Sequence, residues 1–160
     1  VEDALPWKCS ADFRWFKHLT TGQVVIMGRA TYDSLPNGAL PNRVNIVITS
    51  DKDFKDDKVK MVRTFEGAVL LACRDYDELD LFVIEGATLF KKALPHCTGA
   101  YVSTVNTVVN PGYKHMVMAP ILPPHKVDMS WPLKGTLDEI MAGQPLVNVE
   151  KLTFTNPIPL

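Results

Sequence analysis

The 160-residue sequence lacks a long apolar run, a strong net charge and a paired set of cysteines. No apolar stretch approaches the ~18 residues that cross a bilayer, and no signal-peptide pattern is present, so we expect a soluble protein without a membrane partner. The 17 Lys and Arg residues nearly balance the 18 Asp and Glu residues. Nucleic-acid-binding proteins usually carry a basic excess, so we expect no nucleic-acid partner.

The three cysteines are odd in number and far apart, at Cys9, Cys73 and Cys97. This spacing fits neither a disulfide framework nor a zinc site, so we expect no metal and a reducing, cytoplasmic location. Cys9 lies near the candidate site described below. We interpret it as an apolar filler rather than a reactive thiol, because buried free cysteine is common.

Unbroken apolar runs of strand length alternate with helix signals up to residue 105, in a chain of single-domain length (1–160). The expected strands cover 24–27, 44–49, 59–62, 81–84 and 101–105. This alternation predicts an α/β fold whose mostly parallel central sheet has helices on both faces. Ligands of such folds bind at the carboxyl ends of the strands, where Gly28, Ser50 and Gly86 lie.

The C-terminal third gives weaker signals. Prolines stand at positions 111, 120, 123, 124, 132 and 145. Because proline removes a backbone donor, they leave room only for short strands. We expect these at 116–118 and 149–155 with antiparallel pairing, and one or two helical turns at 137–141.

Capping residues mark two helix starts, at Ser10 and at Thr64. The first places Asp12 in the opening turn of a helix, close to Trp7 and a buried strand. Partial desolvation there would make Asp12 a candidate proton donor or hydrogen-bond anchor. Alternatively, Asp12 is only a favourable charge at a helix N-terminus, and the residues alone leave both interpretations open.

The strand at 24–27 ends in Gly28-Arg29 and leads into a second helix. Backbone N–H groups at that helix start, with an arginine beside them, favour an anion. The segment therefore predicts a phosphate site in the same stretch of sequence as the candidate acid.

Several motifs stand at defined spacings along the first 47 residues. They are LPW at 5–7, Asp12, Phe16-Lys17, Thr20, VIMGRATYDSLP from Val25, LPNR at 40–43 and NIV at 45–47. Together they resemble dihydrofolate reductase over Leu5 to about Val105. The resemblance implies that family's fold and a monomer that reduces 7,8-dihydrofolate to 5,6,7,8-tetrahydrofolate with NADPH. Hydride would go to C6 with Asp12-assisted protonation at N5, and dihydrofolate and antifolate-type molecules would be ligands.

The resemblance also implies roles for individual residues. Trp7 would enclose the substrate and hold an ordered water, although it could merely pack under a loop. Arg43 would clamp the carboxylate of the substrate's glutamate tail, although it could be a surface arginine. The residues implied to bind substrate are Phe16, Leu35, Leu40, Arg43, Ile84 and Ser103.

NADPH would be held at the strand ends. The residues implied are Gly28, Arg29, Thr31, Thr49, Ser50, Arg63, Gly86, Ala87 and Thr88. Among them Arg29, Ser50 and Arg63 would surround the 2′-phosphate that distinguishes NADPH from NADH.

Two departures from the family pattern qualify the resemblance. Glu85 replaces the first glycine of a Gly-Gly pair, and its carboxylate would repel cofactor phosphates. The chain also starts at Val1, where the family has already passed its first, central strand, so we expect residues before Val1. These departures leave open a homologue kept as a structural or binding component. A related riboflavin-pathway reductase is disfavoured by the match from LPW to Asp12.

Overall fold

The computed structural model describes residues 7–84, 86–109 and 118–160. The chain divides into two compact units. We call Val1–Leu19 with Cys97–Ile158 the antiparallel unit, and Thr20–His96 with Pro159–Leu160 the parallel unit. Each name follows from the sheet that the unit contains.

The parallel unit contains a four-stranded sheet in the order β3-β2-β1-β4, with every neighbouring pair parallel. Its elements are β1 (Val24–Gly28), α2 (Arg29–Ser34), β2 (Val44–Ile48), β3 (Val59–Val62), α3 (Phe65–Asp75), β4 (Leu81–Val83), α4 (Ala87–Ala93) and the 3-10 helix η1 (Leu94–His96). The predicted α/β class with a central parallel sheet is confirmed. The strand positions also agree with the apolar runs.

The middle strands form the core of this unit. In β1, Val24, Val25, Ile26 and Met27 are fully buried, and Ile46 and Val47 of β2 are buried beside them. Each such side chain contributes ~1.5–3 kcal/mol by leaving water. Helix α3 begins as expected, because the Thr64 side chain accepts a hydrogen bond from the Gly67 N–H at 3.0 Å.

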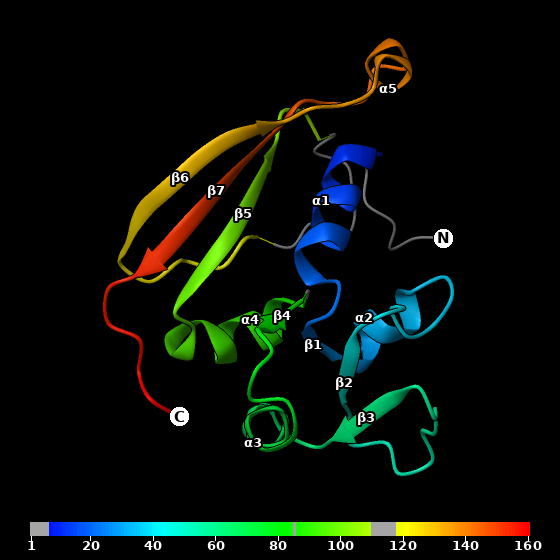
Figure 1. The fold of residues 1–160 in the computed structure, drawn as a ribbon, viewed down its shortest axis with the longest axis vertical. Helices are drawn as coiled ribbons and strands as arrows, with labels where there is room; N and C mark the ends of the chain where they lie inside the picture. The colour runs from blue at the N-terminus through cyan, green and yellow to red at the C-terminus, as the bar shows by residue number, and fades with distance from the viewer. Residues whose placement is uncertain (1–6, 85, 110–117) are drawn as a thin grey trace. The chain divides into compact units, whose positions relative to one another are not determined.

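The antiparallel unit contains a three-stranded sheet in which β7 lies between β5 and β6 (Figure 1). Its elements are α1 (Ser10–Thr20, whose last residue falls in the other unit), β5 (Gly99–Val105), β6 (His125–Leu133), α5 (Leu137–Met141) and β7 (Val147–Phe154). The expected antiparallel C-terminal strand is thus confirmed as β7. Strand β5 is antiparallel to β7 and does not continue the parallel order predicted from the alternation.

The expectation of only short strands after Asn106 is wrong for β6, which has nine residues and includes Pro132. The reason is its position at an edge of the sheet, where a proline need not donate to a second neighbour. At Gly99 the backbone of β7 comes so close that an added Cβ would lie 2.2 Å from the Leu152 carbonyl oxygen. Only glycine fits there. The strand expected at 116–118 lies largely outside the described residues.

Aromatic side chains join α1 to the antiparallel sheet. The Trp15 ring meets Trp131 edge-on with 5.3 Å between centroids, and Tyr101 with 5.9 Å. Buried Val147 and Val149 lie in the same cluster. Each such edge-to-face pair contributes ~0.5–1.5 kcal/mol to stability beyond the effect of buried area, so these contacts fix the position of α1 on the antiparallel sheet.

Candidate active site

The carboxyl ends of three parallel strands align in the parallel unit. Gly28 of β1 is in register with Ile48 of β2, and Ile48 with Val62 of β3. The residues that follow these strands are therefore neighbours at the carboxyl end of the sheet, which we call the sheet edge. They are Arg29, Thr49 and Arg63. The Thr49 N–H donates to the Val62 carbonyl at 2.9 Å, which extends the pairing by one residue.

Two glycines leave room at this edge. Gly28 has an ordinary extended backbone (φ −79°), and an added Cβ would have no atom within 4 Å, so neither strain nor neighbouring atoms require a glycine there. Gly86 has φ +104°, a conformation that disfavours any side chain, and its added Cβ would lie 3.8 Å from Thr31 Oγ1. The structure thus brings Gly28, Gly86 and the buried Thr31 to the carboxyl end of the sheet.

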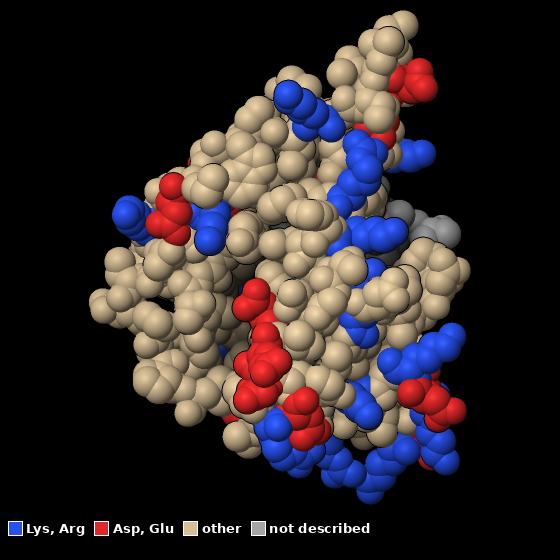
Figure 2. Space-filling model, viewed as in Figure 1, with Lys and Arg blue, Asp and Glu red and all other residues tan. Residues whose placement is uncertain are grey.

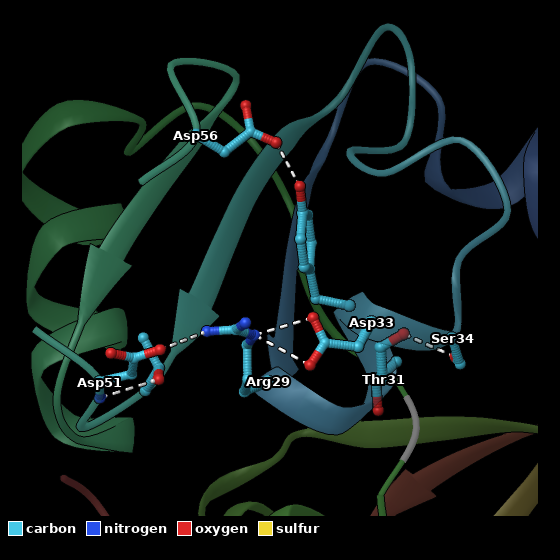
Figure 3. Close-up of polar contacts among 8 residues, drawn as sticks. Arg29, Thr31, Asp33, Ser34, Asp51 and Asp56 are labelled. Atoms are coloured by element: carbon cyan, nitrogen blue, oxygen red, sulfur yellow. Dashed lines mark hydrogen bonds and ion pairs between the residues drawn. The ribbon is translucent and has the colours of Figure 1, made fainter. Parts of the chain in front are cut away.

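Arg29 lies between two carboxylates (Figure 3). Its Nε donates to both oxygens of Asp33 at 2.8 and 2.9 Å, and its Nη1 donates to Asp51 Oδ2 at 3.0 Å. The guanidinium carbon stands 4.2 Å from the centroid of the Phe54 ring. The hydrogen bond that Arg29 donates to Asp33 raises the pKa of Arg29. The hydrogen bond from the Asp53 backbone, followed by that from Arg29, lowers the pKa of Asp51.

The remaining residues proposed from sequence around this edge are accessible. Ser50, Arg63 and Thr88 are exposed, and Ala87 is half-buried at the start of α4. Positive and negative side chains lie next to one another around β3, in the lower part of Figure 2. Arginine and hydroxyl donors beside open glycine backbone fit a phosphate-bearing ligand, and two carboxylates stand among them.

Arg43 is held by the chain itself. Its Nε donates to the Pro41 carbonyl and its Nη1 to the buried Thr20 hydroxyl, both at 3.0 Å. Partial burial lowers the pKa of Arg43. The guanidinium therefore has a fixed orientation within the parallel unit, as a directional contact to a carboxylate requires.

Three sequence-predicted pocket residues of the parallel unit pack against its core. Leu35, Leu40 and Ile84 are partly buried against the cluster that includes Val25 and Met27. The Ile84 N–H donates to the Ile26 carbonyl at 2.9 Å, which continues the β1–β4 pairing. All three have a structural role, and their remaining surface is accessible to a ligand.

The candidate acid belongs to the antiparallel unit. Asp12 is half-buried in the first turn of α1, as expected from sequence. Trp7 packs against the cluster of Cys9, Val147 and Val149. Phe16 is half-buried, four residues after Asp12, and therefore on the same side of the helix.

Ser103 also lies in the antiparallel unit. It is half-buried, pairs in register with Val149, and shares a face of the sheet with Tyr101 and Val105. Trp15 of α1 contacts that face.

Comparison with known proteins decides the family. The family model for dihydrofolate reductase matches residues 1–117. The chain is 41% identical over 106 residues to dihydrofolate reductase of Haemophilus influenzae, and 36% identical over 107 residues to that of Neisseria gonorrhoeae. The chain belongs to the dihydrofolate reductase family.

The matches to these family members are partial. They cover 66% and 67% of this chain, and 63% and 64% of the two bacterial proteins. The solved dihydrofolate reductase of Enterococcus faecalis, complexed with NADP(H) and RAB-propyl, has a similar fold with a TM-score of 0.78. That similarity covers 95% of this chain and 86% of the other at 22% identity.

Sequence reasoning missed the residues that fix the start of α1 in this family member. The Ser10 N–H donates to the Gln144 side chain at 2.8 Å, so an acceptor distant in sequence binds an N–H group at the helix start. Arg14 forms a two-bond ion pair with Glu139, which closes a capping box with Thr136 at α5. The spacing Thr136 to Glu139 was a visible capping-box signal, whereas nothing local marked Gln144.

Other kinds of site are not found in the part of the chain that the structure describes. Within it, no helix combines the length and apolar character needed to cross a bilayer. Nor do three or more His, Cys, Asp or Glu side chains gather there as metal ligands. Glu85, where the sequence departs from the family's Gly-Gly, lies outside the described residues.

Proposed function

We propose that this chain catalyses the NADPH-dependent reduction of 7,8-dihydrofolate to 5,6,7,8-tetrahydrofolate. The observation that carries the proposal is membership of the dihydrofolate reductase family over residues 1–117, the segment that holds Asp12, Arg29 and Arg43. NADP(H) is bound in the Enterococcus faecalis enzyme, whose fold is similar. The edge of the parallel sheet supports the same cofactor class, because its donors suit phosphate.

NADPH supplies the hydride that is delivered to C6 of the substrate. In this chain it would be held by residues at the sheet edge. They are Gly28, Arg29, Thr31, Thr49, Ser50, Arg63, Gly86, Ala87 and Thr88. Glycine at 28 and 86 leaves room for a ligand to approach the backbone, while arginine and hydroxyl groups donate to phosphate oxygens.

Asp12 would hold the aminopyrimidine edge of the substrate and assist protonation at N5. A carboxylate in the first turn of a helix has a defined position, and half-burial strengthens its hydrogen bonds to a ligand. Trp7 would enclose the substrate and hold an ordered water. Both residues are thus assigned to catalysis, Asp12 through proton transfer and Trp7 by excluding bulk solvent.

Substrate specificity is assigned to six further residues. They are Phe16, Leu35, Leu40, Arg43, Ile84 and Ser103. Arg43 would bind the carboxylate of the glutamate tail, and its fixed guanidinium supports that role. Antifolate-type molecules would compete for the same contacts.

We further propose that the protein acts as a monomer in the cytoplasm, with residues 1–160 forming a single domain. Three free cysteines are consistent with a reducing compartment. Light scattering on the purified protein tests the monomer, and a mass above that of one chain would contradict it.

The decisive experiment is turnover. We expect NADPH absorbance to fall when purified protein is mixed with dihydrofolate, and the loss to stop when an antifolate is added. Host reductase carried through purification is controlled for by Asp12→Asn prepared identically. Turnover no greater than that of the control would contradict the proposal.

A further inference from the structure

The Arg29 guanidinium, which the proposed function assigns to the cofactor's 2′-phosphate, already donates hydrogen bonds to two carboxylates, those of Asp33 and Asp51. Arginine has five N–H donors, and Asp33 takes the one on Nε while Asp51 takes one on Nη1. The Phe54 ring stacks on one face of the guanidinium. The remaining donors are the second N–H on Nη1 and the two on Nη2, so a phosphate that shares Nη1 would lie beside Asp51.

The two carboxylates differ in origin. Asp33 lies one helical turn after Arg29, on the same side of α2, so its contact orients the arginine. Asp51 instead comes from the segment directly after Thr49 and Ser50, 22 residues away. Asp33 is thus a positioning residue, whereas Asp51 stands on the side where the ligand phosphate is expected.

Asp51 is anchored independently of Arg29. Its Oδ1 accepts the Asp53 N–H at 2.9 Å, and its own N–H donates to Thr49 Oγ1 at 3.1 Å. These local bonds keep the carboxylate beside Ser50 even when Arg29 binds another anion. The lowered pKa of Asp51 means that it carries its negative charge at neutral pH. With side chains 35% and 46% exposed, Arg29 and Asp51 are both accessible to a ligand.

We propose that Asp51 is a specificity-determining residue that opposes the 2′-phosphate of NADPH and lowers the preference for NADPH over NADH. The inference rests on the proposed function. A dianionic phosphate bound to Arg29 and Ser50 meets the Asp51 charge at short range. The free 2′-hydroxyl of NADH carries no charge and can donate a hydrogen bond to a carboxylate, so the same residue does not repel it.

The test measures cofactor binding without turnover. Dissociation constants of NADPH and NADH are determined by fluorescence titration for wild type, Asp51→Asn and Asp53→Asn. Asparagine at 51 keeps an oxygen for the Asp53 N–H while losing the charge. Asp53→Asn is the matched control, since it removes one charge from the same exposed loop but, within the described residues, its carboxylate makes no contact with Arg29.

We expect Asp51→Asn to bind NADPH about 3- to 30-fold more tightly and NADH within about twofold of wild type, because one unfavourable charge contact is removed. Asp53→Asn should leave both constants within about twofold, as for a screened distant charge. Asp51→Ser, which also keeps an acceptor in the turn, should behave like Asp51→Asn. Thermal unfolding of each variant verifies that the fold is kept.

Three outcomes would overturn the inference. The first is an unchanged ratio of the NADPH and NADH dissociation constants in both Asp51 variants. The second is an Asp51→Asn variant that binds both cofactors more tightly by the same factor. The third is an Asp53→Asn variant that binds NADPH as much more tightly as Asp51→Asn does. Competition of adenosine 2′,5′-bisphosphate and of adenosine 5′-monophosphate against bound NADPH restricts the comparison to the phosphate site. If neither NADPH nor NADH binds to wild type or any variant, the cofactor assignment itself fails, and this inference fails with it.

Discussion

The two units bury their strands in different ways. In the parallel unit, β1 is buried along its first four residues and β2 at its three middle residues, whereas β3 at the side of the sheet is partly exposed. In the antiparallel unit, β6 is largely exposed and β7 mixes buried with exposed positions along its length. The first pattern suits strands covered on both faces, and the second suits a sheet with one covered face.

In the parallel unit, the residues that stabilise the fold and the candidate ligand-binding residues occupy different positions along the chain, whereas in the antiparallel unit they lie on the same elements. At the parallel sheet, apolar residues form the strands and the residues that could bind a ligand follow them, as Ile48 is followed by Thr49 and Ser50. In the antiparallel unit, Asp12 lies on a helix whose Trp15 packs on the sheet. In the parallel unit, substitutions of residues that follow a strand, such as Ser50, should therefore change binding more than stability, and substitutions of buried strand residues should change stability more than binding.

The largest expected effect is that of Asp12→Asn. We expect turnover of dihydrofolate at neutral pH to fall by about 10²- to 10⁴-fold, because the proton-handling group is lost. The dissociation constant of NADPH, whose proposed ligands lie in the parallel unit, should change by less than about twofold within measurement scatter. Steady-state kinetics and cofactor titration are compared on one preparation. Full activity at pH 7 would show that Asp12 is not the acid.

A core substitution tests whether the units unfold together. Ile26→Ala removes a fully buried side chain from β1 and should lower the free energy of unfolding by ~2–5 kcal/mol. All three tryptophans (Trp7, Trp15, Trp131) lie in the antiparallel unit, whereas far-ultraviolet circular dichroism reports both units. For a single cooperative domain, the urea midpoints from both probes should fall equally.

The control for this substitution is Leu70→Ala on α3, where the side chain is 70% exposed and the loss should stay within ~0.5 kcal/mol. If Ile26→Ala shifts the circular dichroism signal but leaves the tryptophan midpoint unchanged, the units unfold independently. The proposal of a single domain would then be wrong.

The parts of the fold that sequence predicts well are those with local causes. Helix α1 begins at Ser10 and strand β3 covers Val59–Val62 as expected, and Thr64 caps α3. Each follows from residues within a few positions of one another. Strand β6 was missed because most of its side chains are exposed, so it lacks an apolar run, and because its pairing comes from β7, at a distance in sequence.

The candidate site shows the same limit. The order of residues along the sequence predicts that Gly28, Ser50 and Gly86 lie at the carboxyl ends of strands, because parallel strands share that edge. It does not predict that Asp51 bonds to Arg29 or that Gln144 bonds to the start of α1. Those contacts span 22 residues for the first pair and 134 for the second, and depend on how loops close.

At the parallel sheet edge, Arg29→Ala should weaken NADPH binding by about 10- to 100-fold, as for loss of a charge-assisted contact, and NADH binding by less than about threefold. The substitution also leaves Asp33 and Asp51 without their shared cation, which adds to repulsion of the phosphate. Fluorescence titration with both cofactors measures the difference. Equal losses for NADPH and NADH would assign Arg29 a structural role.

The smallest expected effect concerns Glu139 in the antiparallel unit. Hydrogen bonds from Arg14 and from the Thr136 backbone lower the pKa of Glu139 from its ordinary value of 4.5 to about 2. A lowered folded-state pKa means that the contribution to stability is complete above pH 4.5 and is lost as the pH falls toward about 2. Glu139→Gln should therefore be less stable than wild type at neutral pH, and the difference should shrink below pH 4.5.

Urea midpoints measured from neutral pH to the lowest pH at which the protein remains folded reveal this convergence. Asp138→Asn is the matched control, because it removes the neighbouring exposed charge in the same turn of α5 while Arg14 keeps its bonds to Glu139. Its difference from wild type should not follow the same pH course. Since Arg14 belongs to α1, whose first turn holds Asp12, cofactor titration of Glu139→Gln adds a second reading. An unchanged NADPH affinity is expected, because the proposed cofactor residues lie in the parallel unit. A weakened affinity would show that the stability of the antiparallel unit and the binding of NADPH are coupled.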